Sequence, residues 1–204
     1  MPEARETAPT RSALMDLRRE RGFVAEGREL LDQKRLLVAG EALRCLSELE
    51  AERTRLFDRD RAARDALADA VGQHGIEELS VRPLAASRWQ IAVVERRFLG
   101  IPLVRVELSV SDGPAPEITN PSPEATRCRD RYRELLVVAA RVGALERSID
   151  VLRAEYRRTH RRVRALDNVV LPELDHAIRA VEDQLDAQDR EEMLRARMAR
   201  SAGS

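Results

Sequence analysis

The N-terminal part of the chain has an apolar repeat of seven residues, with no proline between about residues 10 and 74. Two series of apolar positions follow this step: Leu17, Val24, Leu31, Val38 and Cys45, and then Ala42, Leu49, Leu56, Ala63 and Ala70. Such a repeat places a narrow apolar seam along one side of a helix. A helix of about 65 residues would be roughly 95–100 Å long, so we expect it to need a partner helix rather than a globular core.

A second long helix is predicted from about residue 124 to residue 200. Its apolar positions alternate between steps of three and four: Leu135, Val138, Val142, Leu145, Ile149, Leu152, Tyr156, Thr159, Val163, Leu166 and Val170. Two steps of four follow, through Leu174 to Ile178, which is a stutter that locally unwinds a left-handed supercoil. Pro172 falls at the same place, yet the helical pattern continues for another 28 residues. We therefore expect a kink or change of twist near Leu171, and not a helix end.

The middle of the chain has a strand pattern. Val104, Val106, Leu108 and Val110 alternate with polar residues, which is typical of a half-buried strand. Gly100 and Pro102 interrupt this run, which predicts two short strands in a hairpin. A helix stop is expected at Gln73-His74-Gly75 and a proline-rich loop between residues 111 and 123. Trp89 is interpreted as a packing anchor of this middle region.

These elements predict a mainly α protein, a long antiparallel two-helix coiled coil with a small β-hairpin-containing knob at the turn. We expect three segments: an N-terminal coiled-coil helix (1–74), the central knob (75–123) and a C-terminal coiled-coil helix (124–204). Counting outward from the turn places Cys45 beside Leu152 and Leu14 near residue 183. Cys45 and Cys128 are then too far apart for a disulfide, and we expect free thiols.

Composition agrees with exposed helices and narrows the function. Charged residues make up 35% of the 204 residues and aromatic residues 3%, while 36 basic and 36 acidic residues give zero net charge. This composition is typical of coiled coils and disfavours general nucleic-acid binding. No apolar run is long enough to span a bilayer, and the N-terminus does not resemble a signal peptide, so we expect a cytosolic protein.

No catalytic or cofactor-binding pattern is present in the sequence. His74, His160 and His176 are scattered, without metal-ligand spacing. The glycine patterns of phosphate-binding and dinucleotide-binding loops are missing. We therefore predict neither catalytic activity, nor a bound metal, nor a cofactor.

Six arginines between Arg153 and Arg164 raise the main functional question. They lie on the solvent side of the predicted seam. One interpretation is an exposed face balanced by acids such as Glu155 and Asp167, and another is contact with an acidic protein surface. Nucleic-acid binding is a third, which the neutral net charge disfavours.

Two long stretches resemble a known family. The matching C-terminal residues are Thr159, Arg161-Arg162-Val163, Ala165-Leu166, Val169, Pro172, Leu174, Ile178, Val181, Leu185 and Arg190-Glu191, and the N-terminal ones are Pro9-Thr10, Leu14, Leu17, Gly27, Leu30-Leu31 and Lys34-Arg35. The segment GIPLVRVE matches more loosely. Together they resemble the D subunit of V-type and archaeal-type ATPases and ATP synthases. Arginine in place of most lysines, Asp167-Asn168, and a short, weakly basic C-terminus depart from the family pattern.

This resemblance implies a central rotor shaft without an active site of its own. It implies insertion into a hexamer of A and B subunits, association with the F subunit, and contact near the knob with the C/d-type subunit that caps the membrane rotor ring. Rotation would couple ATP synthesis or hydrolysis to proton or sodium transport. The protein would be cytoplasmic and peripheral to the cell membrane, without inserting into it.

Seven residues are candidates for partner contact. They are Arg157, Arg158, Arg161, Arg162, Pro172, Lys34 and Arg35. Two alternatives stay open. One is a cytosolic coiled-coil scaffold or adaptor without a motor role. The other is an enzyme or nucleic-acid module on a helical arm, for which the middle region is small.

Overall fold

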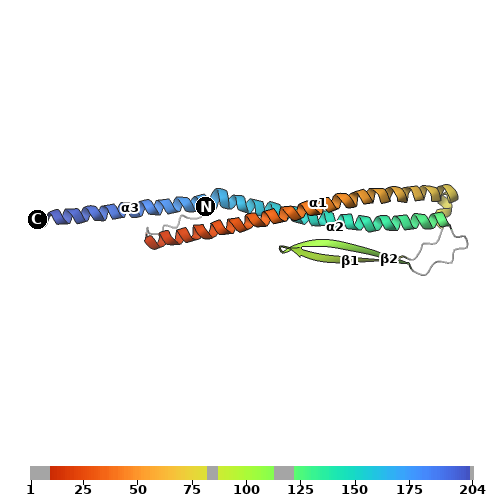
Figure 1. Cartoon of the computed structure of the whole chain (residues 1–204), viewed down its shortest axis with the longest axis horizontal. Coiled ribbons are helices and arrows are strands. Elements are labelled where there is room, and N and C mark those ends of the chain that lie inside the picture. The colour runs from red at the N-terminus through yellow and green to blue at the C-terminus, as the bar shows by residue number, and fades with distance from the viewer. Residues whose placement is uncertain (1–9, 82–86, 113–121, 203–204) are drawn as a thin grey trace. The chain divides into compact units, whose positions relative to one another are not determined.

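The computed structural model describes residues 10–81, 87–112 and 122–202. Its elements are, in order, α1 (Arg11–Val81), β1 (Ser87–Phe98), β2 (Ile101–Asp112), α2 (Pro123–Ala165), the π-helix η1 (Leu166–Val170) and α3 (Leu171–Ala202) (Figure 1). The predicted fold class is confirmed: the chain is mainly helical, and its strands form one two-stranded antiparallel hairpin.

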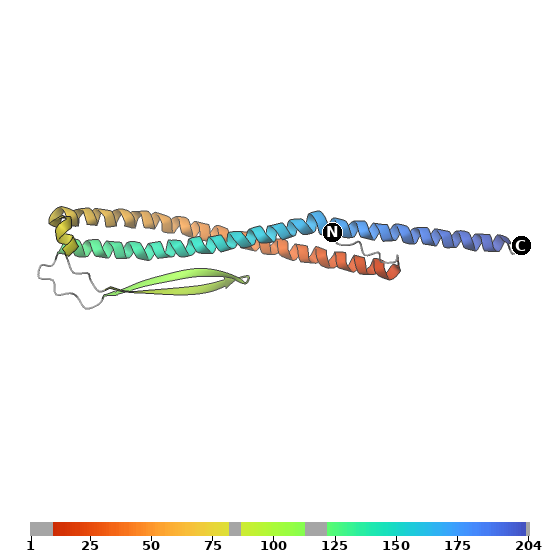
Figure 2. The same ribbon diagram turned by 180° about the vertical axis from the view of Figure 1, so that it is seen from behind.

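The chain divides into two compact units, which are described separately. The hairpin unit is Leu37–Tyr156, and the terminal unit combines Met1–Leu36 with Arg157–Ser204. In the hairpin unit, α1 and α2 lie side by side in opposite directions (Figure 2). Cys45 and Leu152 belong to one buried cluster, together with Val38. The predicted neighbourhood of Cys45 and Leu152 is therefore confirmed.

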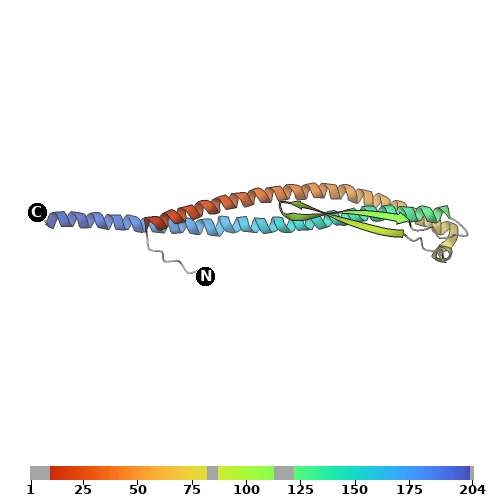
Figure 3. The same cartoon turned by 90° about the horizontal axis from the view of Figure 1, so that it is seen from below.

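The two strands form a hairpin closed by Leu99-Gly100. Phe98 pairs with Ile101, and the register continues to Ser87 and Asp112. Leu99 and Gly100 both have positive φ, 50° and 80°, as in the type I′ turns of two-residue hairpins. The hairpin lies back along the helices of its unit (Figure 3), and Ile101 joins the buried cluster.

Trp89 is not a packing anchor. Its side chain is 41% exposed, so that prediction is wrong. Its neighbours along β1 show the reason, because every β1 residue from Arg88 to Arg97 is exposed. The hairpin contacts the helices through its tip and through β2, whereas none of the described helices buries the Trp89 end of β1.

The turn suggests a stabilising substitution, Leu99→Asn. A leucine at positive φ is unfavourable, and Asn-Gly is the preferred type I′ sequence. We expect this change to stabilise the chain by about 0.5–1 kcal/mol, measured by thermal denaturation. Gly100→Ala is the opposite control and should lower the melting temperature. A lower melting temperature for Leu99→Asn would contradict this account of the turn.

The helix ends at the turn of the hairpin unit are well defined. Gly75, with φ 75°, interrupts α1 where the stop was predicted, and helix resumes as far as Val81. Ser122 caps α2: its Oγ accepts the N–H of Ala125 at 3.0 Å, while Pro123 occupies the first helical position, where its missing N–H is harmless. Most of the predicted proline-rich loop, residues 113–121, lies outside the described residues.

In the terminal unit, the predicted change near Leu171 takes the form of a π turn. The N–H of Leu171 bonds to the C=O of Leu166, one residue further back than in an α-helix. Two sequence features favour it. Pro172 cannot continue α-helical bonding without a clash, and a wider turn absorbs the extra residue of the stutter. Helix continues afterwards as α3, and its seam residues Ile178 and Val181 are buried.

Candidate partner-binding surface

A row of ion pairs, here named the arginine ladder, joins the helices of the terminal unit. Its members are Arg11–Asp189 (3.5 Å), Arg18–Glu182 (2.6 Å), Arg21–Asp175 (2.5 Å) and Arg28–Asp167 (2.8 Å). Every arginine comes from α1, and every acid comes from η1 or α3. The ladder therefore gives the pairing of these segments a fixed direction and register.

Asp167 belongs to this ladder and not to the arginines near it in sequence. Arg28 donates to both of its carboxylate oxygens, through Nε at 2.8 Å and Nη2 at 3.2 Å. These hydrogen bonds lower the pKa of Asp167 and raise the pKa of Arg28. The interpretation in which Asp167 neutralises the arginines between 153 and 164 is therefore wrong.

Four of the candidate arginines form an exposed cationic surface, here named the arginine face. It consists of Arg157, Arg158, Arg161 and Arg162, all of which are exposed on the last turns of α2. The spacing of four between Arg157 and Arg161 and between Arg158 and Arg162 places them on one side of the helix. Thr159, between them in sequence, and Val163, directly after Arg162, are both buried. Across the residues that the structure describes, none of the four arginines has an ion pair with this chain.

The other three candidates lie in different surroundings. Arg35 is engaged within the terminal unit, since its Nη2 lies 2.7 Å from Asp32 and its Nη1 lies 3.1 Å from Nδ1 of His160. Lys34 is half-buried, and Pro172 is exposed in the first turn of α3. The arginine face is therefore the group of candidates most available to a partner.

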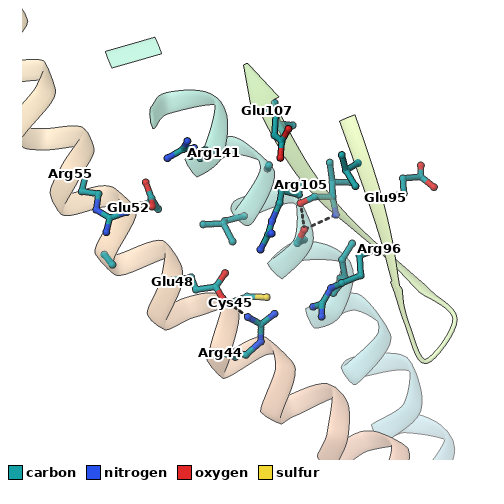
Figure 4. A pocket seen from close by; sticks show the side chains of 18 residues that line it. Arg44, Cys45, Glu48, Glu52, Arg55, Glu95, Arg96, Arg105, Glu107 and Arg141 are labelled. Carbon is teal, nitrogen blue, oxygen red and sulfur yellow. Dashed lines mark hydrogen bonds and ion pairs between the residues drawn. The ribbon is translucent and has the colours of Figure 1, made fainter. Parts of the chain in front are cut away.

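In the hairpin unit, a buried carboxylate fastens the hairpin to α1. Glu41 accepts two hydrogen bonds from Arg44, at 3.0 Å and 2.7 Å, and a third from Arg96 of β1. Figure 4 shows Arg96 reaching toward Arg44, whereas Glu95 is directed away from the helices. These bonds lower the pKa of Glu41, chiefly through Arg44 and against the opposing effect of burial.

A second fastening closes the outer edge of β2. The hydroxyl of Ser148 on α2 accepts the N–H of Val104 at 3.0 Å and donates to its C=O at 3.1 Å. Beyond these contacts, a groove of about 950 Å³ separates part of the hairpin from the helices. Charged residues of both signs line it, including Glu52, Arg55, Arg105 and Arg141. The hairpin is thus tied to the helices near its tip.

Replacing Glu41 tests this fastening. We expect Glu41→Gln to lower the free energy of unfolding at pH 7 by about 1–2 kcal/mol, because a charged hydrogen-bond acceptor of two arginines is lost. The pKa of Glu41 is lower in the folded state, so the stabilisation by its ionised carboxylate is fully present above the unfolded pKa of about 4.3. It is lost as the pH falls through the lower folded-state value. Urea denaturation followed by circular dichroism at pH 7 and in acid measures both effects.

Glu48→Gln is the matched control for this substitution. Glu48 also pairs with Arg44, but its side chain is 41% exposed, so the change should stay within about 0.5 kcal/mol. Equal losses in the two variants, or a Glu41→Gln effect that does not shrink in acid, would contradict the assignment.

Two other kinds of site are missing from the described residues. Among residues 10–81, 87–112 and 122–202, no three His, Cys, Asp or Glu side chains are grouped so that they could hold a metal ion. None of the helices in these ranges combines the length and apolarity that crossing a bilayer requires.

Nearly the whole chain is similar to known proteins of one family. The family model described as the D subunit of ATP synthase matches residues 13–201. The D subunit of the V-type ATP synthase of Anaeromyxobacter sp. (strain Fw109-5) is 32% identical over 200 residues, which cover 96% of this chain and 93% of the relative. The D subunit of the A-type ATP synthase of Pyrococcus abyssi is 27% identical over 209 residues, covering 98% and 96%.

A third relative comes from another organism. The D subunit of the V-type ATP synthase of Thermotoga neapolitana is 25% identical over 190 residues, covering 92% of this chain and 94% of the relative. The family match thus includes the arginine face, the hairpin and every member of the ladder except Arg11. The chain belongs to the family of ATP synthase D subunits.

Proposed function

We propose that this protein is the central rotor shaft of a V-type or A-type ATPase or ATP synthase. It would transmit torque between ATP synthesis or hydrolysis in an A/B hexamer and proton or sodium translocation in the membrane sector. The family match over residues 13–201 carries this proposal. The long helices support it, as do the names of the relatives, which are D subunits of V-type and A-type ATP synthases.

The physical properties of the two units suit such a shaft. A helix pair joined by a buried seam resists bending and twisting better than one helix. In the terminal unit, the arginine ladder adds polar contacts that oppose sliding of one helix along the other. The surface offers partners many charged groups, each worth about 0–1 kcal/mol when exposed. Weak contacts of this kind would let a shaft turn without deep stopping points.

The proposed partners are the A and B subunits, the F subunit and the C/d-type subunit that caps the rotor ring. The arginine face would contact acidic surfaces of these partners, with Lys34, Arg35 and Pro172 as further contact candidates. The shaft itself would have no active site, and would be held at the cytoplasmic side of the cell membrane through the complex. The segments 1–74, 75–123 and 124–204 would be its N-terminal helix, knob and C-terminal helix.

Co-purification from gently solubilised membranes tests the proposal. The full-length chain carries a tag, and the recovered proteins are identified and quantified by mass spectrometry. We expect A, B and F subunits, with about one copy of this chain for each hexamer, and cross-links within that complex would locate the contacts. Recovery of a defined set of other proteins without ATPase subunits would favour the alternative, a coiled-coil scaffold or adaptor.

A further inference from the structure

The two edges of the hairpin differ in how their backbone groups are satisfied. Antiparallel pairs alternate between residues that bond to each other and residues whose N–H and C=O point outward. Val104 bonds outward to Ser148, so its cross-strand partner Glu95 also points outward from β1. By alternation, the outward residues of β1 are Trp89, Ile91, Val93, Glu95 and Arg97. Those of β2 include Pro102, which has no N–H to leave unpaired.

Within residues 10–81, 87–112 and 122–202, the β1 edge is open, whereas the β2 edge is partly closed. Ser148 takes both backbone groups of Val104, and Pro102 interrupts the row of donors. No hydrogen bond from another described element reaches the outward groups of β1. A long edge without protection is a template for another strand. Residues 89–94 of β1 also contain no charged side chain that would discourage such pairing.

The same outward residues carry an apolar surface. Trp89, Ile91 and Val93 are 41%, 66% and 58% exposed, and they lie on one face because they alternate along the strand. Their cross-strand partners, Val110, Leu108 and Val106, are apolar too and lie on the same face. A two-stranded hairpin is itself marginal in water, and a third strand is a common remedy. Backbone groups and side chains therefore offer one continuous surface to an added strand.

The size of this surface helps to decide what covers it. The three exposed side chains present on the order of 300 Å² of apolar area. This is well below the roughly 800 Å² that each partner contributes to a stable protein–protein interface. Contacts between side chains alone would thus hold a partner only weakly. Strand addition needs less area, because main-chain hydrogen bonds supply much of the affinity.

We propose that the outer edge of β1 binds an extended strand of a neighbouring subunit, which would make the hairpin a three-stranded sheet. The charges specify that strand further: apolar residues lie opposite Trp89, Ile91 and Val93, a basic residue opposite Glu95, and an acidic residue opposite Arg97. The inference rests on the proposed function, because the neighbour is a subunit of the same ATPase complex.

Amide hydrogen exchange at single-residue resolution tests the edge directly. The full-length chain is compared alone and in the purified complex. We expect the N–H groups of Trp89, Ile91 and Val93 to exchange rapidly in the free chain and at least about tenfold more slowly in the complex. The intervening residues Gln90 and Ala92 already bond to β2 and serve as internal references. Unchanged exchange at the three outward amides would overturn the proposal.

A matched pair of proline substitutions provides the second test. Val93→Pro and Val106→Pro each remove one outward N–H, at directly opposite positions of the two strands. Both leave the hydrogen bonds between β1 and β2 intact. Val93→Pro removes a hydrogen bond to the added strand, and its ring clashes with that strand, so we expect it to bind the complex roughly tenfold more weakly. The affinity of Val106→Pro should stay within about twofold of that of the unsubstituted chain. Equal effects of the two substitutions would overturn the assignment to β1.

The remaining outcomes separate this inference from the proposed function. Outward amides protected in the dilute free chain would indicate a segment of the chain itself on the edge. Protection that grows with concentration would indicate a second copy. Either result overturns the proposal. If co-purification with the tagged chain recovers no ATPase subunits, the proposed function is wrong, and the edge assignment that rests on it is wrong as well. If it recovers them while the β1 amides stay unprotected, only the edge assignment fails.

Discussion

Leu152→Ala is expected to destabilise the hairpin unit by about 3 kcal/mol, within the range of 2–5 kcal/mol for a buried leucine replaced by alanine. The Leu152 side chain is completely buried, at 0% exposure. It shares its cluster with Val38 and Cys45 of α1 and with Leu103 of the hairpin. The cavity would therefore weaken helix pairing and hairpin docking together. Urea denaturation followed by circular dichroism measures the loss.

Leu136→Ala on the same helix is the control for this prediction. Leu136 is 45% exposed, and alanine favours helix slightly more than leucine does, so the change should be within about 0.5 kcal/mol. A Leu152→Ala loss no larger than that of Leu136→Ala would show that the cluster around Cys45 contributes little to folding.

Replacing the whole arginine face by alanine is expected to weaken association with the ATPase complex by about tenfold or more. Arg157, Arg158, Arg161 and Arg162 are exposed, and each contact with a partner carboxylate is worth about 0–1 kcal/mol. Four such losses sum to about 0–4 kcal/mol, and the expected tenfold change corresponds to about 1.4 kcal/mol within that range. Quantitative co-purification measures the association, and ATP turnover with coupled ion transport measures the functional effect.

The matched control replaces the same four arginines by lysine. Lysine retains the charge but not the planar fork of the guanidinium group, so binding retained by lysine and lost by alanine would assign the effect to charge. Circular dichroism should show unchanged helix content in both variants, because the side chains are exposed. Normal assembly and coupling of the alanine variant would remove the arginine face from the candidate contacts.

The seam and the hairpin were predictable from the sequence because each depends on a regular period. The seven-residue series that contains Val38 and Cys45 has no exposed member. Counting outward from one turn was enough to bring Cys45 to Leu152. Alternation likewise predicted β2, since Val104 and Val106 are half-buried while Arg105 is exposed.

Features that depend on which individual side chains meet could not be predicted in this way. The stutter and Pro172 indicated where the helix changes, but several distortions relieve the same clash, so the π turn itself was not foreseen. Proximity in sequence suggested that Asp167 pairs with nearby arginines. In the structure, the pairing of the helices brings Asp167 to Arg28, which donates a hydrogen bond to it. Trp89 was expected to be buried because of its size, but nothing in the sequence showed which face of the hairpin meets the helices.

The arginine ladder also limits which helix α1 can pair with. Arg21 and Arg28 are seven residues apart. Further steps of seven lead to Ala42 and Leu49, so the two arginines occupy the same heptad position as these seam residues. In a parallel, in-register pair of two α1 helices, equivalent seam positions would meet, and Arg21 would face Arg21 of the other copy. The acids that relieve this repulsion, Asp175 and Asp167, are supplied by the C-terminal half of the chain. The ladder thus disfavours parallel, in-register pairing of two α1 helices and favours pairing of α1 with the C-terminal half of a chain.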